Sequence, residues 1–217
     1  NNDNEVIDYI TKWANEHDMV VNNSKEYTYS INSGTSFGGS GRNKLTNELR
    51  NYNVWGNKHI PSDYKFNSRM TRLAILAGLL DTDGYLHNNC YEIVQKNKTL
   101  AYDIVELSQS LGFRTTHTTC LKRCTNSPDP NHEDEYVRIH ISGTGLDEIP
   151  CLIERKQAHV RESDKDALVS GIIVEPVGED TYYGFELDGN GRFLLDDFTV
   201  THNSTTTGHM IFKLGGI

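Results

Sequence analysis

The chain has 217 residues, of which 36% are hydrophobic, and a formal net charge of −9 at pH 7. This length and apolar content suit one or two domains with a hydrophobic core and exclude a fully disordered chain. No apolar run reaches the roughly 18 residues that span a membrane, and the N-terminal residues lack a secretory layout. The four cysteines show no disulfide framework, which favours an intracellular protein, in the cytoplasm or in the nucleus.

The negative charge is concentrated in one short segment. Residues 162–200 carry two basic and ten acidic side chains, whereas residues 40–161 carry sixteen basic and fourteen acidic ones. Residues 42–72 form a basic stretch that would suit contact with phosphates and would equally suit a solvated basic face. The acidic total therefore does not exclude a nucleic-acid partner.

Apolar spacing predicts a mixture of helices and strands. Pro61 interrupts regular structure, Gly84 is placed to end a helix, and no internal repeat is visible. This order predicts an α+β fold for the middle of the chain. The predicted elements, in chain order, are a helix over 6–14, a strand over 27–31, a helix over 45–52, a helix over 68–83, a strand over 91–94, a helix over 99–111, and strands over 114–119 and 136–141.

The pattern changes to short strands and turns after residue 170, which predicts an all-β part. Asp188-Gly189-Asn190-Gly191 is a hairpin signal within it. Composition and pattern divide the chain into segments 1–40, 41–161, 162–203 and 204–217.

The most unusual string is Leu76-Ala77-Gly78-Leu79-Leu80-Asp81-Thr82-Asp83-Gly84. Ala77 and Gly78 remove side-chain bulk, so another helix could approach closely. Asp81 and Asp83 come at the helix C-terminus, where a carboxylate is unfavourable beside the negative end of the dipole. Such acids need a compensating cation, for which a divalent metal is a natural candidate. A buried helix whose acids only cap or turn is an equally weighted alternative.

This string resembles the LAGLIDADG motif of the dodecapeptide homing endonucleases, and Asn57-Lys58-His59-Ile60-Pro61 resembles the segment before the second motif copy of intein-borne members. The resemblance implies helices on an antiparallel, saddle-shaped sheet that lies in the major groove of a long double-stranded DNA site. It implies Mg²⁺ held by Asp83, and a catalytic basic residue, here Lys156. The residues expected to contact the DNA backbone are Arg42, Lys44, Lys58, Lys65, Arg69 and Arg155.

A cleaving unit of this family has two motif copies, whereas this chain has one. Residues 1–40 resemble the tail of a first repeat, and residues 41–161 resemble the second repeat. We therefore expect a missing N-terminal intein portion that carries the other motif. The alternatives are a single-motif endonuclease acting as a dimer and a DNA-binding remnant whose nuclease is inactive.

A second candidate site is His202-Asn203-Ser204. An Asn side-chain amide can attack its own main-chain carbonyl and release the following residue, a neighbouring His can act as the general acid, and a following Ser can accept an acyl group. The triplet alone is more often an ordinary loop.

The segment from Tyr182 to Asn203 resembles the C-terminal splicing blocks of an intein, whose splicing domain is of the Hint type. The resemblance implies that Asn203 cyclises with help from His202 and that Ser204 is the transesterification nucleophile. Gly191 stands where many inteins carry a further assisting His, so Arg192 or ordered water would replace it. Without an N-terminal splicing segment, we expect cleavage at Asn203–Ser204 rather than splicing.

Residues 204–217 resemble the segment after the phosphate-binding Gly-Lys of translation elongation factor 1 alpha. The resemblance implies a GTPase host whose P-loop Ser204 would complete after the intein leaves. A GTPase as such is a weaker alternative, because only these residues support it.

Overall fold

The computed structural model describes residues 3–26, 28–34, 43–123, 132–160, 169, 173–176, 178–179, 181 and 184–203. The chain divides into two compact units, Asn1–Ala167 and Leu168–Ile217.

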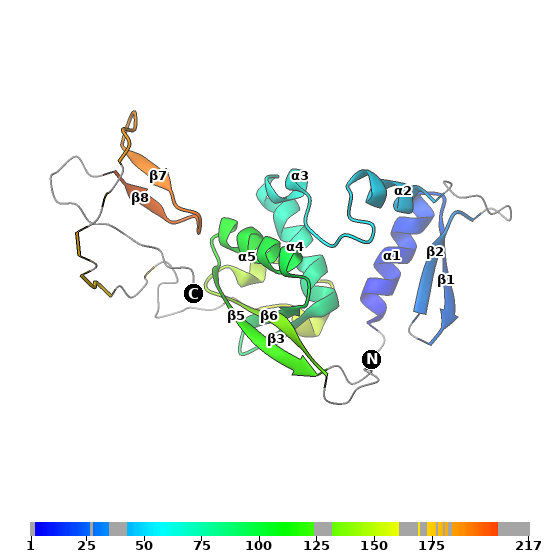
Figure 1. Ribbon diagram of the computed structural model, residues 1–217. Helices are drawn as coiled ribbons and strands as arrows, with labels where there is room; N and C mark the ends of the chain where they lie inside the picture. The colour runs from blue at the N-terminus through cyan, green and yellow to red at the C-terminus, as the bar shows by residue number, and fades with distance from the viewer. Residues whose placement is uncertain are drawn as a thin grey trace. The chain divides into compact units, whose positions relative to one another are not determined.

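The larger unit is built around a four-stranded antiparallel sheet with the strand order β3-β4-β6-β5. Two helices, α4 and α5, lie over one face of this sheet (Figure 1). The α+β prediction for this part of the chain is confirmed. The bounds are α4 Arg69–Asp83, β3 Gly84–His87, β4 Cys90–Gln95, α5 Lys98–Ser110, β5 Arg114–Arg123 and β6 Glu133–Ser142.

The core forms because side chains alternate along the strands while α4 and α5 each turn an apolar stripe toward them. Tyr91 and Ile93 on β4 are 1% exposed and pack with Leu76 and Leu80 of α4. The alternate residues point to the other face, which we call the open face. Its members are Tyr85, His87, Cys90, Glu92, Val94, Arg114, Thr116, Thr118, Cys120, Lys122, Asp134, Tyr136, Arg138, His140 and Ser142.

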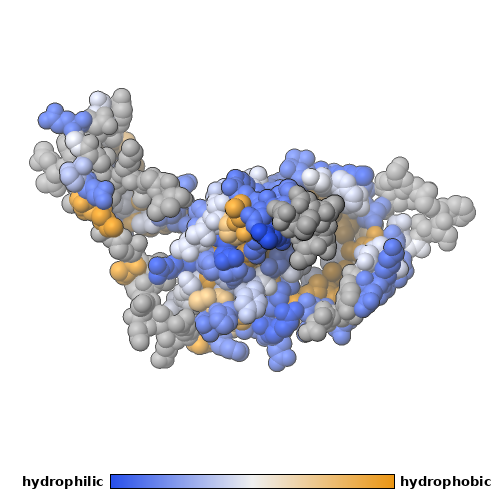
Figure 2. Space-filling view, turned by 60° about the horizontal axis from the view of Figure 1, so that its bottom comes forward, coloured by the Kyte–Doolittle hydropathy of each residue, from blue (hydrophilic) through white to orange (hydrophobic). Residues whose placement is uncertain are grey.

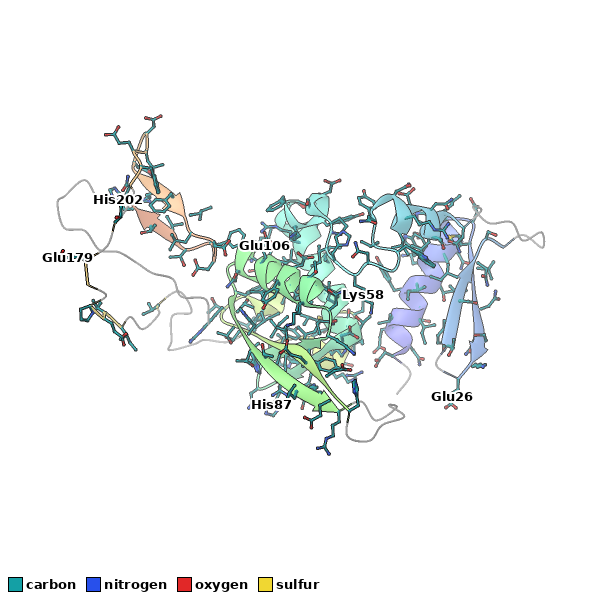
Figure 3. The ribbon with its side chains drawn as sticks, in the orientation of Figure 1. Glu26, Lys58, His87, Glu106, Glu179 and His202 are labelled. Atoms are coloured by element: carbon teal, nitrogen blue, oxygen red, sulfur yellow. The ribbon has the colours of Figure 1, made fainter. Side chains whose placement is uncertain are left out.

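The side of the larger unit that carries the open face comes forward in Figure 2 and is mostly hydrophilic, with small hydrophobic patches. In Figure 3, His87 lies on this side, and Glu106 lies on α5 above the sheet. The open face is therefore a polar surface that none of the described helices covers.

Gly84 ends α4, but not through the left-handed cap that its position predicts. Its φ is −83° and its ψ is 157°, so the chain passes directly from the helix into β3. A Cβ on Gly84 would lie 2.7 Å from both Cα and the carbonyl oxygen of Leu80. Glycine is therefore needed here for close backbone approach.

The N-terminal part of the larger unit contains α1 (Asn4–Glu16) and a hairpin of β1 (Val20–Lys25) and β2 (Thr28–Asn32). This arrangement matches α5, β5 and β6. Helices α1 and α5 each have 13 residues, and both are followed by three residues and an antiparallel pair. In each pair, the first residue of the first strand faces the last residue of the second, Val20 facing Asn32 and Arg114 facing Ser142.

The connection after each of these helices also has the same backbone geometry. Asp18 and Gly112 occupy equivalent positions and have φ values of 57° and 87°. The next residue in each copy donates its N–H five residues back, from Met19 to Ala14 and from Phe113 to Ser108. The two segments therefore repeat one backbone arrangement, although apolar spacing showed no repeat in the sequence.

Short elements connect these parts. Pro61 interrupts the chain as predicted and is the residue before α3. The predicted helices over 6–14, 45–52, 68–83 and 99–111 are all confirmed with shifted ends, whereas the prediction missed β1 and β3. The remaining elements of the larger unit are α2 Lys44–Asn51, α3 Ser62–Lys65, η1 Leu146–Glu148 and η2 Glu154–Lys156.

The smaller unit contains one antiparallel pair among its described residues, β7 (Arg192–Leu194) and β8 (Val200–His202). The predicted hairpin at Asp188–Gly191 is misplaced. Gly189 and Gly191 do adopt positive φ values of 69° and 66°, but the turn precedes β7, and the paired strands enclose residues 195–199 instead. No helix in the described part of the chain is long and apolar enough to cross a membrane.

Candidate functional site

An exposed carboxylate marks the C-terminal end of α4. Asp83 is the last residue of this helix, and its Oδ2 accepts a hydrogen bond of 2.9 Å from Nε2 of Gln95. Gln95 is 7% exposed and lies at the end of β4. A buried amide therefore fixes the orientation of an accessible acid.

Asp81, two residues earlier, has a different environment. It is 4% exposed, and its carboxylate accepts hydrogen bonds from the main-chain N–H groups of Leu152 and Ile153, at 2.8 and 3.2 Å. These donors supply the compensation for which the sequence argument invoked a cation. Asp81 is thus a structural acid that fastens the 152–156 segment to α4.

Lys156 lies at the same helix end and is 5% exposed. Its Nζ donates to the carbonyl oxygens of Leu80, at 2.9 Å, and of Asp81, at 2.6 Å. A cation there is favourable because it faces main-chain carbonyls at the negative end of the helix dipole. Burial, together with the charge of Arg155, lowers the pKa of Lys156. The structure therefore places Asp83 and Lys156 at one end of the same helix.

Tyr91 supports this arrangement from the sheet. Its hydroxyl donates to the main-chain oxygen of Lys156 at 2.7 Å and accepts from the N–H of Ala158 at 3.2 Å. Burial raises the pKa of Tyr91, and burial also raises the pKa of the neighbouring Cys151 thiol to about 11. Both groups are therefore neutral donors and acceptors at physiological pH.

The outer face of α4 carries small residues, which we call the small-residue face: Ala74, Gly78 and Thr82. All three are exposed, and a Cβ on Gly78 would meet nothing within 4 Å. This face leads directly to Asp83. A second helix could thus approach α4 beside the exposed carboxylate.

Four of the predicted DNA-contacting cations form ion pairs with other described residues. Lys44 pairs with Asp18 at 3.2 Å, and Arg155 pairs with Asp3. Lys58 is exposed in the segment between α2 and α3 (Figure 3) and forms no ion pair with a described residue. Arg42 lies outside the described residues.

Two further cations of that set join elements of the fold. Nζ of Lys65 lies 2.8 Å from both Asp103 and Glu106 on α5. Burial lowers the pKa of Lys65, but the hydrogen bonds to these two carboxylates outweigh that effect and raise it overall. Arg69 contacts Glu148 through Nε and Nη2. DNA contact by these residues stays a prediction.

In the smaller unit, His202 is the last residue of β8 (Figure 3), and Asn203 follows it in the chain. The N–H of Asn203 donates to the carbonyl oxygen of Gly191 at 2.6 Å, and its side-chain amide donates to the carbonyl oxygen of Phe185. A Cβ on Gly191 would come within 3.3 Å of Nε2 of His202. The imidazole of His202 therefore lies directly beside Gly191, and replacement of the upstream assisting His by Arg192 or ordered water stays a prediction. Ser204 lies outside the described residues.

Neither Gln95 nor the cluster of Glu92, Arg138 and His140 on the open face was among the residues predicted from the sequence. Gln95 follows Tyr91 and Ile93 at alternate positions, so a polar residue on the buried side of a strand was the available signal. The cluster had no such signal, because cross-strand register brings its members together.

Mg²⁺ accepts one or two carboxylates together with phosphate oxygens and waters. Asp83 supplies one accessible carboxylate, and no group of three or more His, Cys, Asp or Glu side chains suited to a metal occurs among the described residues. The chain thus fits a shared site completed by other oxygen donors, and does not fit a self-contained cage.

Residues 59–161 match the homing endonuclease family model, and this match covers α4, the four-stranded sheet, α5, Asp83, Gln95 and Lys156. This part of the chain is therefore similar to homing endonucleases.

Two curated proteins share a long segment with the chain. The replicative DNA helicase DnaB of Mycobacterium intracellulare is 43% identical over 169 residues, covering 74% of this chain and 28% of that protein. The homothallic switching endonuclease of Saccharomyces cerevisiae is 28% identical over 162 residues, covering 64% of this chain and 26% of that protein. The chain therefore spans about a quarter of the length of these relatives.

Proposed function

We propose that residues 41–161 are the second repeat of a LAGLIDADG homing endonuclease, which hydrolyses double-stranded DNA with Mg²⁺. The observation that carries this proposal is the exposed carboxylate of Asp83, oriented by Gln95 at the end of a helix with an exposed small-residue face. The match of residues 59–161 to homing endonucleases supports it.

The open face is the proposed DNA-binding surface. It is polar, it belongs to a twisted antiparallel sheet, and it carries hydroxyl, imidazole and guanidinium groups that can donate to base edges. Lys58 and Arg155 are the proposed contacts to the flanking phosphates, with Arg42, Lys44, Lys65 and Arg69 as further candidates from the sequence.

Asp83 would hold the Mg²⁺, which would polarise the scissile phosphate and activate water. Gln95 keeps the carboxylate turned toward solvent. Lys156 stabilises the helix end and brings a positive charge close to the site, where it would favour charge developing on phosphate oxygens.

A second motif helix would complete the site. Gly78 and Ala74 leave the outer face of α4 without bulk, so helix backbones can come close together. The backbone match between residues 4–32 and the α5-β5-β6 unit supports residues 1–40 as the tail of a first repeat. We propose that a preceding portion of the protein carries the other motif.

The direct test mixes the full chain with a library of duplexes that contain a randomised segment, with Mg²⁺ or with EDTA. When the preceding portion that carries the other motif is supplied, we expect Mg²⁺-dependent double-strand cleavage that Asp83→Asn abolishes, while Asp63→Asn, at an exposed acid on α3, leaves cleavage unchanged. Retained DNA binding by Asp83→Asn would separate chemistry from affinity.

The same assay separates the alternatives. Cleavage that rises with the square of the chain concentration would favour two copies pairing through α4. Cleavage that appears only when the preceding portion is supplied would favour the missing repeat. Selective binding without any cleavage in either case would identify an inactive remnant.

A second proposed function is intein activity by residues 162–203, a C-terminal part of a Hint-type splicing domain. The similar segment occupies about a quarter of a protein named as a helicase and of one named as an endonuclease. One segment shared by proteins with such different names is what an insertion that moves between hosts would produce. The host proposed here is an elongation-factor GTPase, on the resemblance of residues 204–217.

The proposed chemistry depends on the two hydrogen bonds that position Asn203. Its side-chain nitrogen attacks its own main-chain carbonyl, a succinimide forms, and the amine of Ser204 departs with a proton from His202. The carbonyl of Phe185 holds the attacking amide, and Gly191 leaves room for the imidazole.

Intact mass spectrometry after incubation tests this function. We expect slow loss of the Ser204–Ile217 peptide, abolished by Asn203→Ala and slowed by His202→Ala. Asn190→Ala, in the neighbouring turn, is the matched control and should release the peptide at the wild-type rate. Equal release from Asn203→Ala would exclude cyclisation.

A further inference from the structure

Three ionisable side chains lie together on the two inner strands of the open face. Glu92 on β4 faces His140 on β6, and Val94 on β4 faces Arg138 on β6. Nε of Arg138 lies 3.6 Å from Oε1 of Glu92, and Nε2 of His140 lies 3.7 Å from Oε2. One carboxylate is thus flanked by two basic groups on an inner strand.

The side chain of Arg138 is buried at Nε, whereas its terminal guanidinium nitrogens are accessible. Its Nε is buried and has no hydrogen-bond partner among the described residues, and 3.6 Å is too long for a hydrogen bond. The side chain is nevertheless 38% exposed, so the accessible polar part is the terminal fork. Such a fork presents parallel N–H donors in a fixed plane.

The position of this pair favours base edges over phosphates. β6 lies between β4 and β5, so Arg138 is on one of the two inner strands of the sheet. In a sheet that enters the major groove, inner strands face base edges and the rim faces the backbone. The Glu92 carboxylate beside Arg138 would also repel a phosphate, because both are negatively charged. It would not repel the edge of a base, which is neutral.

We propose that Arg138 reads a guanine in the major groove, donating two hydrogen bonds to its O6 and N7, and that Glu92 is a positioning residue for its guanidinium. The assignment rests on the proposed DNA-binding function of the open face. Arg138 then determines specificity at one base pair, while the other members of the face read neighbouring pairs.

In the test, the full chain selects bound duplexes from a randomised library, and the base preference at each position is measured. Wild type should enrich sites with guanine at one position that Arg138 governs. Arg138→Ala and Arg138→Lys should both reduce that preference by about 10- to 100-fold, since lysine keeps the charge but loses the fork. Preferences at the other positions should persist.

Two variants complete the design. Glu92→Gln should weaken the preference at the same position, and combining it with Arg138→Ala should cause no further loss there. Arg50→Ala removes an arginine that stacks on Trp55 and should leave every base preference intact. A melting curve for each variant verifies that it is folded. If Arg138→Ala unfolds, the result for Arg138→Lys decides the question.

The outcomes separate this inference from the function on which it rests. Uniformly weaker binding by Arg138→Ala with all base preferences intact would overturn guanine readout and leave DNA binding in place. No enrichment of any sequence by wild type would overturn both.

Discussion

The side chains of Lys156 and Asp81 each hydrogen-bond to the main chain of the segment that carries the other. The ammonium of Lys156 donates to the main-chain oxygen of Asp81 at 2.6 Å, while the Asp81 carboxylate accepts from the N–H groups of Leu152 and Ile153. The end of α4 and the 152–156 segment are thus joined by reciprocal hydrogen bonds, and Asp83 projects from this junction.

Lys156→Met should lower the free energy of unfolding by about 1–2 kcal/mol, because two buried carbonyls lose a charged donor while the cost of burying that charge is relieved. Urea denaturation measures the change. Arg155→Met, which removes only a partly exposed ion pair, should change it by less than about 1 kcal/mol. Equal losses would contradict the capping role.

Gly84→Ala and Gly78→Ala should have opposite effects on the melting temperature of the chain. At Gly84 the new methyl group would overlap Leu80, so the backbone must shift, at a cost of about 1–3 kcal/mol. At Gly78 it would meet open space, so helix propensity alone should raise stability by roughly 0.5–1 kcal/mol. Destabilisation by Gly78→Ala would show that this face is already packed.

Asp103→Ala should be among the most damaging polar substitutions, at about 2–4 kcal/mol in urea denaturation. It leaves the N–H of Ile60 without its acceptor and removes one partner of the largely buried Lys65 ammonium. Asp103→Asn should lose less, because its oxygen can still accept from Ile60. Asp18→Asn, at an exposed pair with Lys44, should have no measurable effect.

Stability should fall as the pH rises from about 9 to about 11, since the pKa of Cys151 is raised from 9.0 to about 11 by burial. A folded-state pKa above the unfolded value favours the neutral thiol in the native state, so this contribution is complete below pH 9 and lost as the thiol ionises. Urea denaturation at several pH values checks this. The decline should be shallower in Cys151→Ala, and an unchanged slope would exclude the thiol as its source.

Local pattern predicted the helices and inner strands well, because apolar spacing reports directly which side of an element is buried. The sequence correctly predicted that α4 ends at Gly84, but not why a glycine is needed there. The requirement comes from the close approach of Leu80, which only the folded structure shows. The hairpin at Asp188–Gly191 was misplaced because turn residues identify a turn without identifying which strands pair.

The site was only partly predictable for a similar reason. Asp83 stands in a contiguous motif and could be found from sequence, whereas its partner Gln95 depends on how a strand is placed beside a helix. Lys65 and Arg69 looked like a continuous basic surface, but tertiary packing supplies each with carboxylates from distant segments.

The hairpin at residues 20–32 also has consequences for how the protein behaves in solution. Among the described residues β2 pairs only with β1, whereas its counterpart β6 is flanked by strands on both sides. The β2 segment, Thr28–Asn32, contains no charged residue and no proline, so its open edge lacks the usual protection against intermolecular strand addition. We therefore expect the practical concentration limit of this chain to be set by self-association through its N-terminal hairpin, well away from the chemistry at Asp83.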